Sequence, residues 1–245
     1  MNKLTNTLIT TIACGVTGPA AVAQTTPPLD CLLEPHLEVD VGSPVFGILS
    51  SVNVDRGDIV TREQVVAQLE SDSEAAGVKL AEARALFNER KVKRNDDLYK
   101  DELISIHEKD EIETQSLISE LELVEAREKL DMRTIRSPLA GVVVERYMSR
   151  GEYIQEMPVV KLAQINPLNV EVIAPVGLFG SIQVGSTARL ELAPPVGGDY
   201  AVKVTVVDRV IDAASGTFGV RFELPNPNNL IPSGLSCKIY LDFTE

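Results

Sequence analysis

Residues 43–60 read SPVFGILSSVNVDRGDIV, and residues 137–154 repeat the pattern as SPLAGVVVERYMSRGEYI. The spacing from Ser-Pro to Arg-Gly is the same in both copies. Each copy alternates short apolar runs with Gly and Pro, which is typical of short strands joined by tight turns. Gly57 and Gly151 each follow Arg and precede an acid, where a turn needs a positive φ or a close backbone approach. Two such halves predict a small β-sandwich that the intervening chain splits in two.

The residues between the two copies, 72–133, have a different composition. They contain no Pro and no Gly after Gly77, and they are rich in Glu, Lys, Arg, Ala and Leu, which favours helix. The second part contains a stripe of residues spaced three and four apart, as on one face of a helix: Ile112, Ser116, Ser119, Leu123, Ala126 and Leu130. Three neighbouring residues widen this stripe: Leu117, Leu121 and Val124. In the first part, one row holds Ala76, Leu80, Ala83 and Phe87, and a heptad row holds Val78, Ala85, Val92 and Tyr99. The heptad spacing predicts a coiled coil.

A break between the two helices is expected at 101–105. Ser105, followed three residues later by Glu108, is the capping-box signature of a new helix. The insertion is therefore predicted to be an antiparallel α-helical hairpin. With about 27 residues per arm, it would project about 40 Å from the sandwich. A projection of that length with a tip indicates a docking device rather than a loop.

After residue 166 the chain returns to strand patterns. Alternating apolar runs occur at 170–173, 188–192 and 202–206. They are followed by DAASGTFGVRF at 212–222 and NPNNLIPSG at 226–234. The fold class expected from these patterns is mainly β with an inserted α-helical coiled-coil hairpin.

The split repeat with its helical insertion resembles the HlyD-type periplasmic adaptors, or membrane fusion proteins, of tripartite efflux and secretion systems. The run TIRSPLAGVV at 134–143 is similar to the family motif T-x-I-x-A/S-P-x-x-G-x-V, and the stretches at 212–222 and 226–234 resemble its β-barrel motifs. The resemblance implies a lipoyl-like β-sandwich plus a small β-barrel. The expected division is an N-terminal segment at 24–41 joining the β-domains, the sandwich at 42–71 and 134–166, the helical hairpin at 72–133, and the barrel at 167–245.

The resemblance also implies partners and no enzymatic activity. Family adaptors link an inner-membrane transporter to a TolC-like outer-membrane channel, and they assemble as homo-oligomeric rings, hexamers in family members. The inner-membrane transporter is expected to be of the RND (resistance-nodulation-division) or ABC type. RND-type adaptors generally continue into a membrane-proximal domain, whereas this sequence stops at Glu245, so the transporter is expected either to dock on the barrel alone or to be of a class other than RND.

At the hairpin tip, family members carry an Arg, a Leu four residues on and a Ser seven further on, which engage the channel. Arg94, Leu98 and Ser105 stand at these spacings. The alternative interpretation is that Arg94 is a solvated helix charge, Leu98 an inter-helix contact and Ser105 only an N-cap.

The first 23 residues have the pattern of a secretory signal peptide. Lys3 precedes an apolar stretch, and Ala21-Val22-Ala23 forms a cleavage site before Gln24. The apolar stretch is shorter than the roughly 20 residues that a membrane span needs. The alternative is lipidation at Cys14, although Thr11 stands where a lipobox normally has Leu. The protein is therefore expected in the periplasm of a Gram-negative bacterium, held at the inner membrane by its partner.

Cleavage after Ala23 leaves two cysteines, Cys31 and Cys237, near the two ends of the chain. In an oxidising compartment they can form a disulfide, and the alternative is two buried, unpaired thiols. Two cysteines are too few to indicate a zinc site with His36 and His107, and Cys237 lies far along the chain from both histidines. No metal or cofactor is expected.

Composition and motifs disfavour several other classes. The formal charge of −13 disfavours nucleic-acid binding, and the two histidines offer a hydrolase little acid-base chemistry. A biotinyl or lipoyl carrier shares the sandwich, but residues 72–133 replace the turn that would hold its modifiable Lys. A periplasmic scaffold without a transporter shares the whole fold and differs only in its partners.

Overall fold

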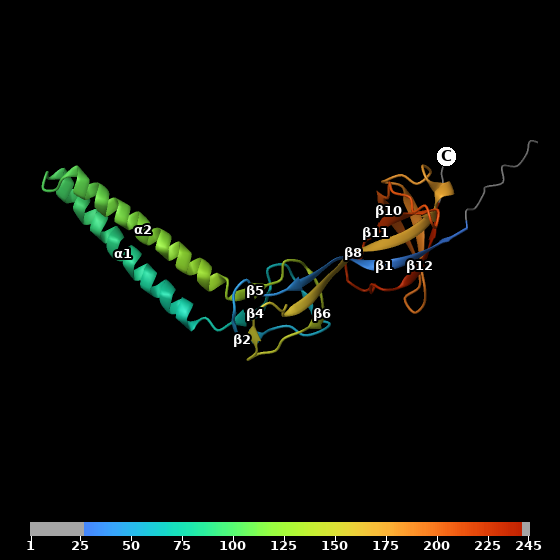
Figure 1. The fold of residues 1–245 in the computed structure, drawn as a ribbon, viewed down its shortest axis with the longest axis horizontal. Helices are drawn as coiled ribbons and strands as arrows, with labels where there is room; N and C mark the ends of the chain where they lie inside the picture. Colours follow the sequence, from blue (N-terminus) through green and yellow to red (C-terminus); the bar gives the residue numbers. More distant parts are fainter. Residues whose placement is uncertain (1–26, 242–245) are drawn as a thin grey trace, which may run out of the picture.

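The computed structural model describes residues 27–241, and the expected signal peptide and Cys14 lie outside them. Figure 1 shows an elongated molecule in which two helices project from one end of two consecutive β-rich parts. Along the chain the elements are β1 (Leu29–Val41), β2 (Gly47–Val52), β3 (Ile59–Val60), β4 (Val65–Leu69), α1 (Asp72–Lys100), α2 (Ile106–Asp131), β5 (Thr134–Arg136), β6 (Gly141–Arg146), β7 (Tyr153–Ile154), β8 (Val160–Pro175), a 3₁₀ turn (Val176–Leu178), β9 (Thr187–Leu192), β10 (Asp199–Val207), β11 (Thr217–Leu224) and β12 (Ser236–Tyr240).

The β-rich part far from the helices is a closed antiparallel barrel. Its strands follow the order β1-β12-β9-β10-β11-β8, and β8 pairs back with β1. Alternate residues of each strand point inward, as in β9, where Ala188, Leu190 and Leu192 are buried. The core is mostly aliphatic, with two buried phenylalanines, Phe218 and Phe222. The prediction of a mainly β chain with a small barrel and two inserted helices is confirmed.

Two sheets face each other between the barrel and the helices. One is the extension of the barrel sheet through β8, β6 and β3, and the other has the order β5-β4-β2-β7. Their shared core includes Leu49, Val66, Val143 and Leu162. The repeat is visible in the fold, because β2 and β6 both begin at the glycine of the Ser-Pro-x-x-Gly motif. The turn glycines predicted from the Arg-Gly pairs have positive φ, 92° at Gly57 and 88° at Gly151.

Strands β1 and β8 run through both β-rich parts. They pair from Cys31 opposite Val172 to Val41 opposite Val160, with a register shift between Pro35 and Leu37. On β8, Leu162 packs into the sandwich core, whereas Ala163 and Ile165 pack into the barrel core. The chain thus passes from one core to the other within a continuous strand, a few residues before the division expected after residue 166.

A disulfide joins Cys31 of β1 to Cys237 of β12. The two residues are direct cross-strand partners, their Cα atoms are 4.9 Å apart, and both side chains are buried. The bond therefore closes the seam between the first and last strands of the barrel, where the two ends of the described chain meet.

The helices pack side by side and antiparallel (Figure 1). The packed side of α2 is the one predicted from its spacing: Ser116 and Ser119 are buried, and Ile112, Leu123, Ala126 and Leu130 are half-buried. On α1 the packed side is the heptad row, with Ala85 buried and Val78 and Val92 half-buried, together with Ala81. No helix in residues 27–241 is long and apolar enough to span a membrane.

The prediction that a second row of α1, with Leu80 and Phe87, packs against α2 is wrong. Leu80 is 56% exposed and Phe87 59% exposed, and they lie roughly 130° around the helix from the buried Ala81 and Ala85. The widening residues of α2 are exposed too: Leu117, Leu121 and Val124. The physical reason is that a two-helix hairpin covers only one narrow face of each helix, and a seam of Ala and Ser draws the helices close without reaching the flanks.

Candidate functional site

The far end of the hairpin is built by the termination of α1. The N–H of Glu102 donates to the carbonyl of Tyr99 at 3.0 Å, and the N–H of Leu103 donates to the carbonyl of Leu98 at 2.9 Å. Glu102 has a left-handed φ of 59°. These features form a Schellman motif, in which Leu98 and Leu103 occupy the two positions that commonly make a hydrophobic contact. The turn is thereby anchored to Leu98.

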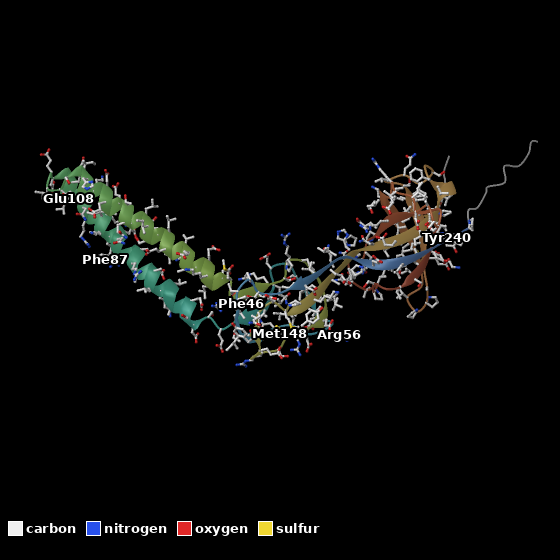
Figure 2. The ribbon with its side chains drawn as sticks, in the orientation of Figure 1. Phe46, Arg56, Phe87, Glu108, Met148 and Tyr240 are labelled. Atoms are coloured by element: carbon white, nitrogen blue, oxygen red, sulfur yellow. A yellow bond between two sulfur atoms is a disulfide. The ribbon has the colours of Figure 1, made fainter. Side chains whose placement is uncertain are left out.

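The start of α2 closes the turn from the other side. The Ser105 hydroxyl accepts from the Glu108 N–H at 3.2 Å, and the Glu108 carboxylate accepts from the Ser105 N–H at 2.9 Å. The predicted capping box is therefore confirmed. Hydrogen bonds from the Ser105 backbone and hydroxyl lower the pKa of Glu108. Figure 2 labels Glu108 at the outermost end of the hairpin.

A lysine fastens the two helices just behind the turn. Lys109 of α2 lies 3.1 Å from the Asp96 carboxylate of α1 and 3.5 Å from Glu113, and its ammonium stands 5.0 Å from the centre of the Tyr99 ring. The hydrogen bond to Asp96 is the main cause of a raised Lys109 pKa. The tip is thus held by backbone bonds, a cap and a cross-helix ion pair.

The three residues singled out in the sequence come to one end of the molecule. Arg94 is exposed on α1, and Leu98 follows one turn later with 38% of its surface exposed. Ser105 lies across the turn, and its hydroxyl also donates to the Glu108 carboxylate at 3.1 Å. Because that hydroxyl is fully engaged in the cap, Ser105 shapes the turn; a role of the three residues in docking stays a prediction.

Two further residues of the tip were missed from the sequence. Leu103 is 68% exposed and Ile106 is 56% exposed, on either side of Ser105. The signal that could have indicated Leu103 is its place five residues after Leu98, at the end of a helix without a terminating glycine. Leu98, Leu103 and Ile106 are thus three exposed apolar side chains at the tip, and the exposed Arg94 lies one helical turn before Leu98.

The chain resembles known proteins in sequence and in fold. It is 23% identical over 212 residues to the solvent efflux pump periplasmic linker SrpA of Pseudomonas putida and, over the same length, to the toluene efflux pump periplasmic linker protein TtgG, also of Pseudomonas putida. These alignments cover 80% of this chain but only 56% and 54% of the two relatives, so the chain spans about half the length of the curated relatives it matches.

A solved structure has a similar fold. A MacA–MexA chimeric protein that contains the α-hairpin domain of Pseudomonas aeruginosa MexA superposes with a TM-score of 0.75 at 19% identity, covering 89% of this chain and 82% of that one. At this identity the likeness concerns the fold alone. Residues 38–163, just over half of the chain, match the family model of the CzcB-like barrel-sandwich hybrid domain. Both halves of the repeat and the helices inserted between them fall within that match, and the chain therefore belongs to the CzcB-like barrel-sandwich hybrid domain family.

Proposed function

We propose that this protein is a periplasmic adaptor of a tripartite export pump, which links an inner-membrane transporter of the RND or ABC type to a TolC-like outer-membrane channel. The observation that carries the proposal is the helical hairpin, which extends away from both β-rich parts (Figure 2). It ends in a capped tip with exposed apolar side chains. The names of the two curated relatives, both periplasmic linkers of efflux pumps, support it. The adaptor acts as a mechanical link, without catalysis or a cofactor of its own.

The tip is the surface that meets the channel. Leu98 and Leu103 are exposed in the free protein, and burying an exposed Leu side chain contributes on the order of 1–2 kcal/mol. Arg94 beside them supplies a planar set of donors for carbonyl or carboxylate oxygens of the partner. The Schellman motif and the capping box fix the turn before docking, which lowers the entropy lost on binding.

The hairpin is a short coiled coil that transmits the position of the sandwich to the tip. Its seam is made of small side chains, Ala81 and Ala85 on α1 and Ser116 and Ser119 on α2, all buried. Ser119 donates its hydroxyl to the carbonyl of Ser116 at 2.8 Å, so the buried hydroxyl is satisfied within α2. Close packing along this seam gives the hairpin its stiffness.

Neighbouring copies associate through the outward sides of the hairpin. The exposed row of α1, with Leu80 and Phe87, faces away from α2, and the exposed row of α2, with Leu117, Leu121 and Val124, faces away from α1. Counted from the base, Leu80 and Phe87 lie at about 12 and 22 Å, and Val124 and Leu117 at about 10 and 21 Å. The α1 row of one copy can thus meet the α2 row of the next at the same height. Such a head-to-tail contact closes into a ring, with six copies as the family resemblance implies.

The expected location in the periplasm and the expected domain division belong to the same proposal. Residues 1–23 would direct export to the periplasm, and the barrel end of the molecule would face the inner membrane. The sandwich at 42–71 and 134–166 and the barrel at 167–245 would form the body of the ring.

The docking role is tested by Arg94→Asp and Leu98→Ser. Each variant is expected to lose in vivo cross-linking to the outer-membrane channel and to lose export. Arg94→Asp should leave circular dichroism and melting unchanged because the Arg94 side chain is exposed, and Leu98→Ser should retain the fold because the Leu98 side chain is 38% exposed. Arg84→Asp makes the same charge change nearer the base of α1 and should retain cross-linking and export. If both tip variants still cross-link and export, the tip assignment is wrong.

The link to a transporter and the ring are tested separately. Affinity capture of the full chain from native membranes should recover an inner-membrane transporter, and recovery of the channel without any transporter would favour a scaffold. Phe87→Glu should reduce self-association measured by sedimentation, because it places a charge in the outward row of α1. Self-association equal to the wild type would argue against the hairpin interface.

A further inference from the structure

The hairpin is attached to the sandwich by two short connections. Strand β4 ends at Leu69 and α1 begins at Asp72, while α2 ends at Asp131 and β5 begins at Thr134. The two connections share one backbone hydrogen bond, from the Leu69 N–H to the Arg133 carbonyl at 2.8 Å. The Glu70 N–H adds one more backbone bond, to the Ile48 carbonyl at 2.8 Å. Beyond these bonds, the direction of the hairpin depends on side chains at its base.

One side chain at the base joins three segments of the chain, its own and two others. Arg133 donates from Nη1 to the carbonyl of Phe46 at 2.9 Å, and from Nη2 to the Glu74 carboxylate in the first turn of α1 at 2.6 Å. It therefore ties the end of α2 to the start of α1 and to the residue preceding β2. Figure 2 labels Phe46 where the helices meet the sandwich.

This ion pair differs from its neighbours in being shielded. The Arg133 and Glu74 side chains are 23% and 20% exposed. The next arginine, Arg136, lies 3.7 Å from Asp131, and those side chains are 41% and 68% exposed. A shielded guanidinium group whose two terminal nitrogens bind two different acceptors is directional, whereas an exposed pair at 3.7 Å contributes little. The two arginines thus provide a matched comparison at the same junction.

The repeat motif leaves room for this contact. A Cβ at Gly47 would lie 2.7 Å from Arg133 Nη1. The equivalent glycine of the second copy, Gly141, faces the main chain instead, because a Cβ there would lie 2.3 Å from the Ala163 carbonyl oxygen. One sequence motif therefore keeps a glycine for two different reasons, and at Gly47 the reason is the guanidinium group of Arg133.

We propose that Arg133 is a positioning residue that fixes the direction in which the hairpin leaves the sandwich, by binding Phe46 and Glu74 together. A tilt of about 10° at the base would move the tip of an arm about 40 Å long by about 7 Å. Its importance for docking rests on the proposed function, since a displaced tip would miss its partner. The direction of the hairpin itself is independent of any partner.

The test measures the distance between spin labels on Glu111→Cys of α2 and Glu145→Cys of β6, both at exposed positions, in the full chain with Cys14→Ser. The parent protein and the Arg136→Gln control should give one narrow distribution. Arg133→Gln should give a distribution at least roughly twofold broader, or one shifted by about 5 Å or more. Gly47→Ala should do the same, because the new methyl displaces the guanidinium group while every charge remains.

Melting temperatures distinguish positioning from folding. Arg133→Gln and Gly47→Ala should change the distance distribution without lowering the melting temperature of the barrel. Glu74→Gln should give an intermediate distribution, because the bond to the Phe46 carbonyl remains. If Arg133→Gln fails to fold, Gly47→Ala decides. The proposal would be overturned if Gly47→Ala and Glu74→Gln gave the same distance distribution as the Arg136→Gln control. This holds whatever the outcome of the channel cross-linking.

Discussion

Replacing Ser105 by Ala removes the hydroxyl that closes the turn at the hairpin tip. The hydroxyl accepts from the Glu108 N–H at 3.2 Å, whereas the bond from the Ser105 N–H to the Glu108 carboxylate, at 2.9 Å, does not need it. Loss of an N-cap hydroxyl costs about 1 kcal/mol, and the surviving half of the capping box argues against the upper end of the measured range. Opening of the first turn of α2 should become about fivefold more frequent, since about 1.4 kcal/mol is a factor of ten.

Hydrogen exchange followed by mass spectrometry on a peptide covering 104–112 measures this opening. Thr114→Ala is the matched control, because its hydroxyl donates to the Asp110 carbonyl at 2.7 Å inside α2 and caps nothing. Its exchange should stay unchanged or become slower, since Ala favours helix. Ser105→Asp retains a capping acceptor and should exchange like the wild type. Wild-type exchange in Ser105→Ala would refute the cap as the element that holds the turn.

Three further predictions concern the body of the protein and its pH dependence. Gly141→Ala should destabilise the protein by about 3 kcal/mol and lower its melting temperature by about 6–12 °C, because the Cβ of the new Ala would meet backbone 2.3 Å away. Gly77→Ala in α1, with no atom within 4 Å of the new methyl, should be neutral or stabilise by up to about 1 kcal/mol. Equal melting of the two variants would contradict the packing at Gly141. Reduction of the Cys31–Cys237 bond should destabilise the barrel by about 3–5 kcal/mol in chemical denaturation, and an unchanged midpoint would argue against the bond. The Glu108 pKa is lowered in the folded protein, so the contribution of its carboxylate to stability is present above the unfolded value near 4.3 and is lost as the pH falls through the folded pKa. Hydrogen exchange at the tip, corrected for intrinsic rates, should therefore show less protection at pH 3 than at pH 6. Equal protection at the two pH values would argue against a stabilising role of the Glu108 carboxylate.

The hairpin and the cap at the start of its second helix could be predicted because their signals are local. The capping box at Ser105 depends on residues three apart, and the packed row of α2 follows from spacing alone. The packed row of α1 could not be chosen in the same way. Two rows have helical spacing, and the more hydrophobic one, with Leu80 and Phe87, lies outside. The buried Ser116 and Ser119 of the partner helix bring the backbones close, so Ala81 and Ala85 fit the seam and larger side chains do not.

The junction of the two β-rich parts was less predictable. The sandwich was expected to end at residue 166 and the barrel to begin at 167, but β8 runs through this boundary from Val160 to Pro175. Its partner there is β1, more than a hundred residues away in the sequence, and the register shift of β1 after Pro35 accommodates the extra length of β8. The buried Asn226 then fixes the strand by donating to the Ile165 carbonyl at 3.0 Å. Each of these contacts is long-range, so no local pattern could reveal the continuous strand.

The sheet edges are short, whereas the helices expose rows of apolar side chains, and this difference supports the proposed mode of association. The barrel is closed, and the free edges of the two sandwich sheets are the short strands β3, β5 and β7, of two, three and two residues. Short edges offer few unpaired backbone groups, so they disfavour association by strand pairing. The hairpin instead exposes Leu80 and Phe87 on one side and Leu117 and Leu121 on the other. Binding through side chains of a stiff hairpin, rather than through strand addition, is therefore the mode of association that this fold favours.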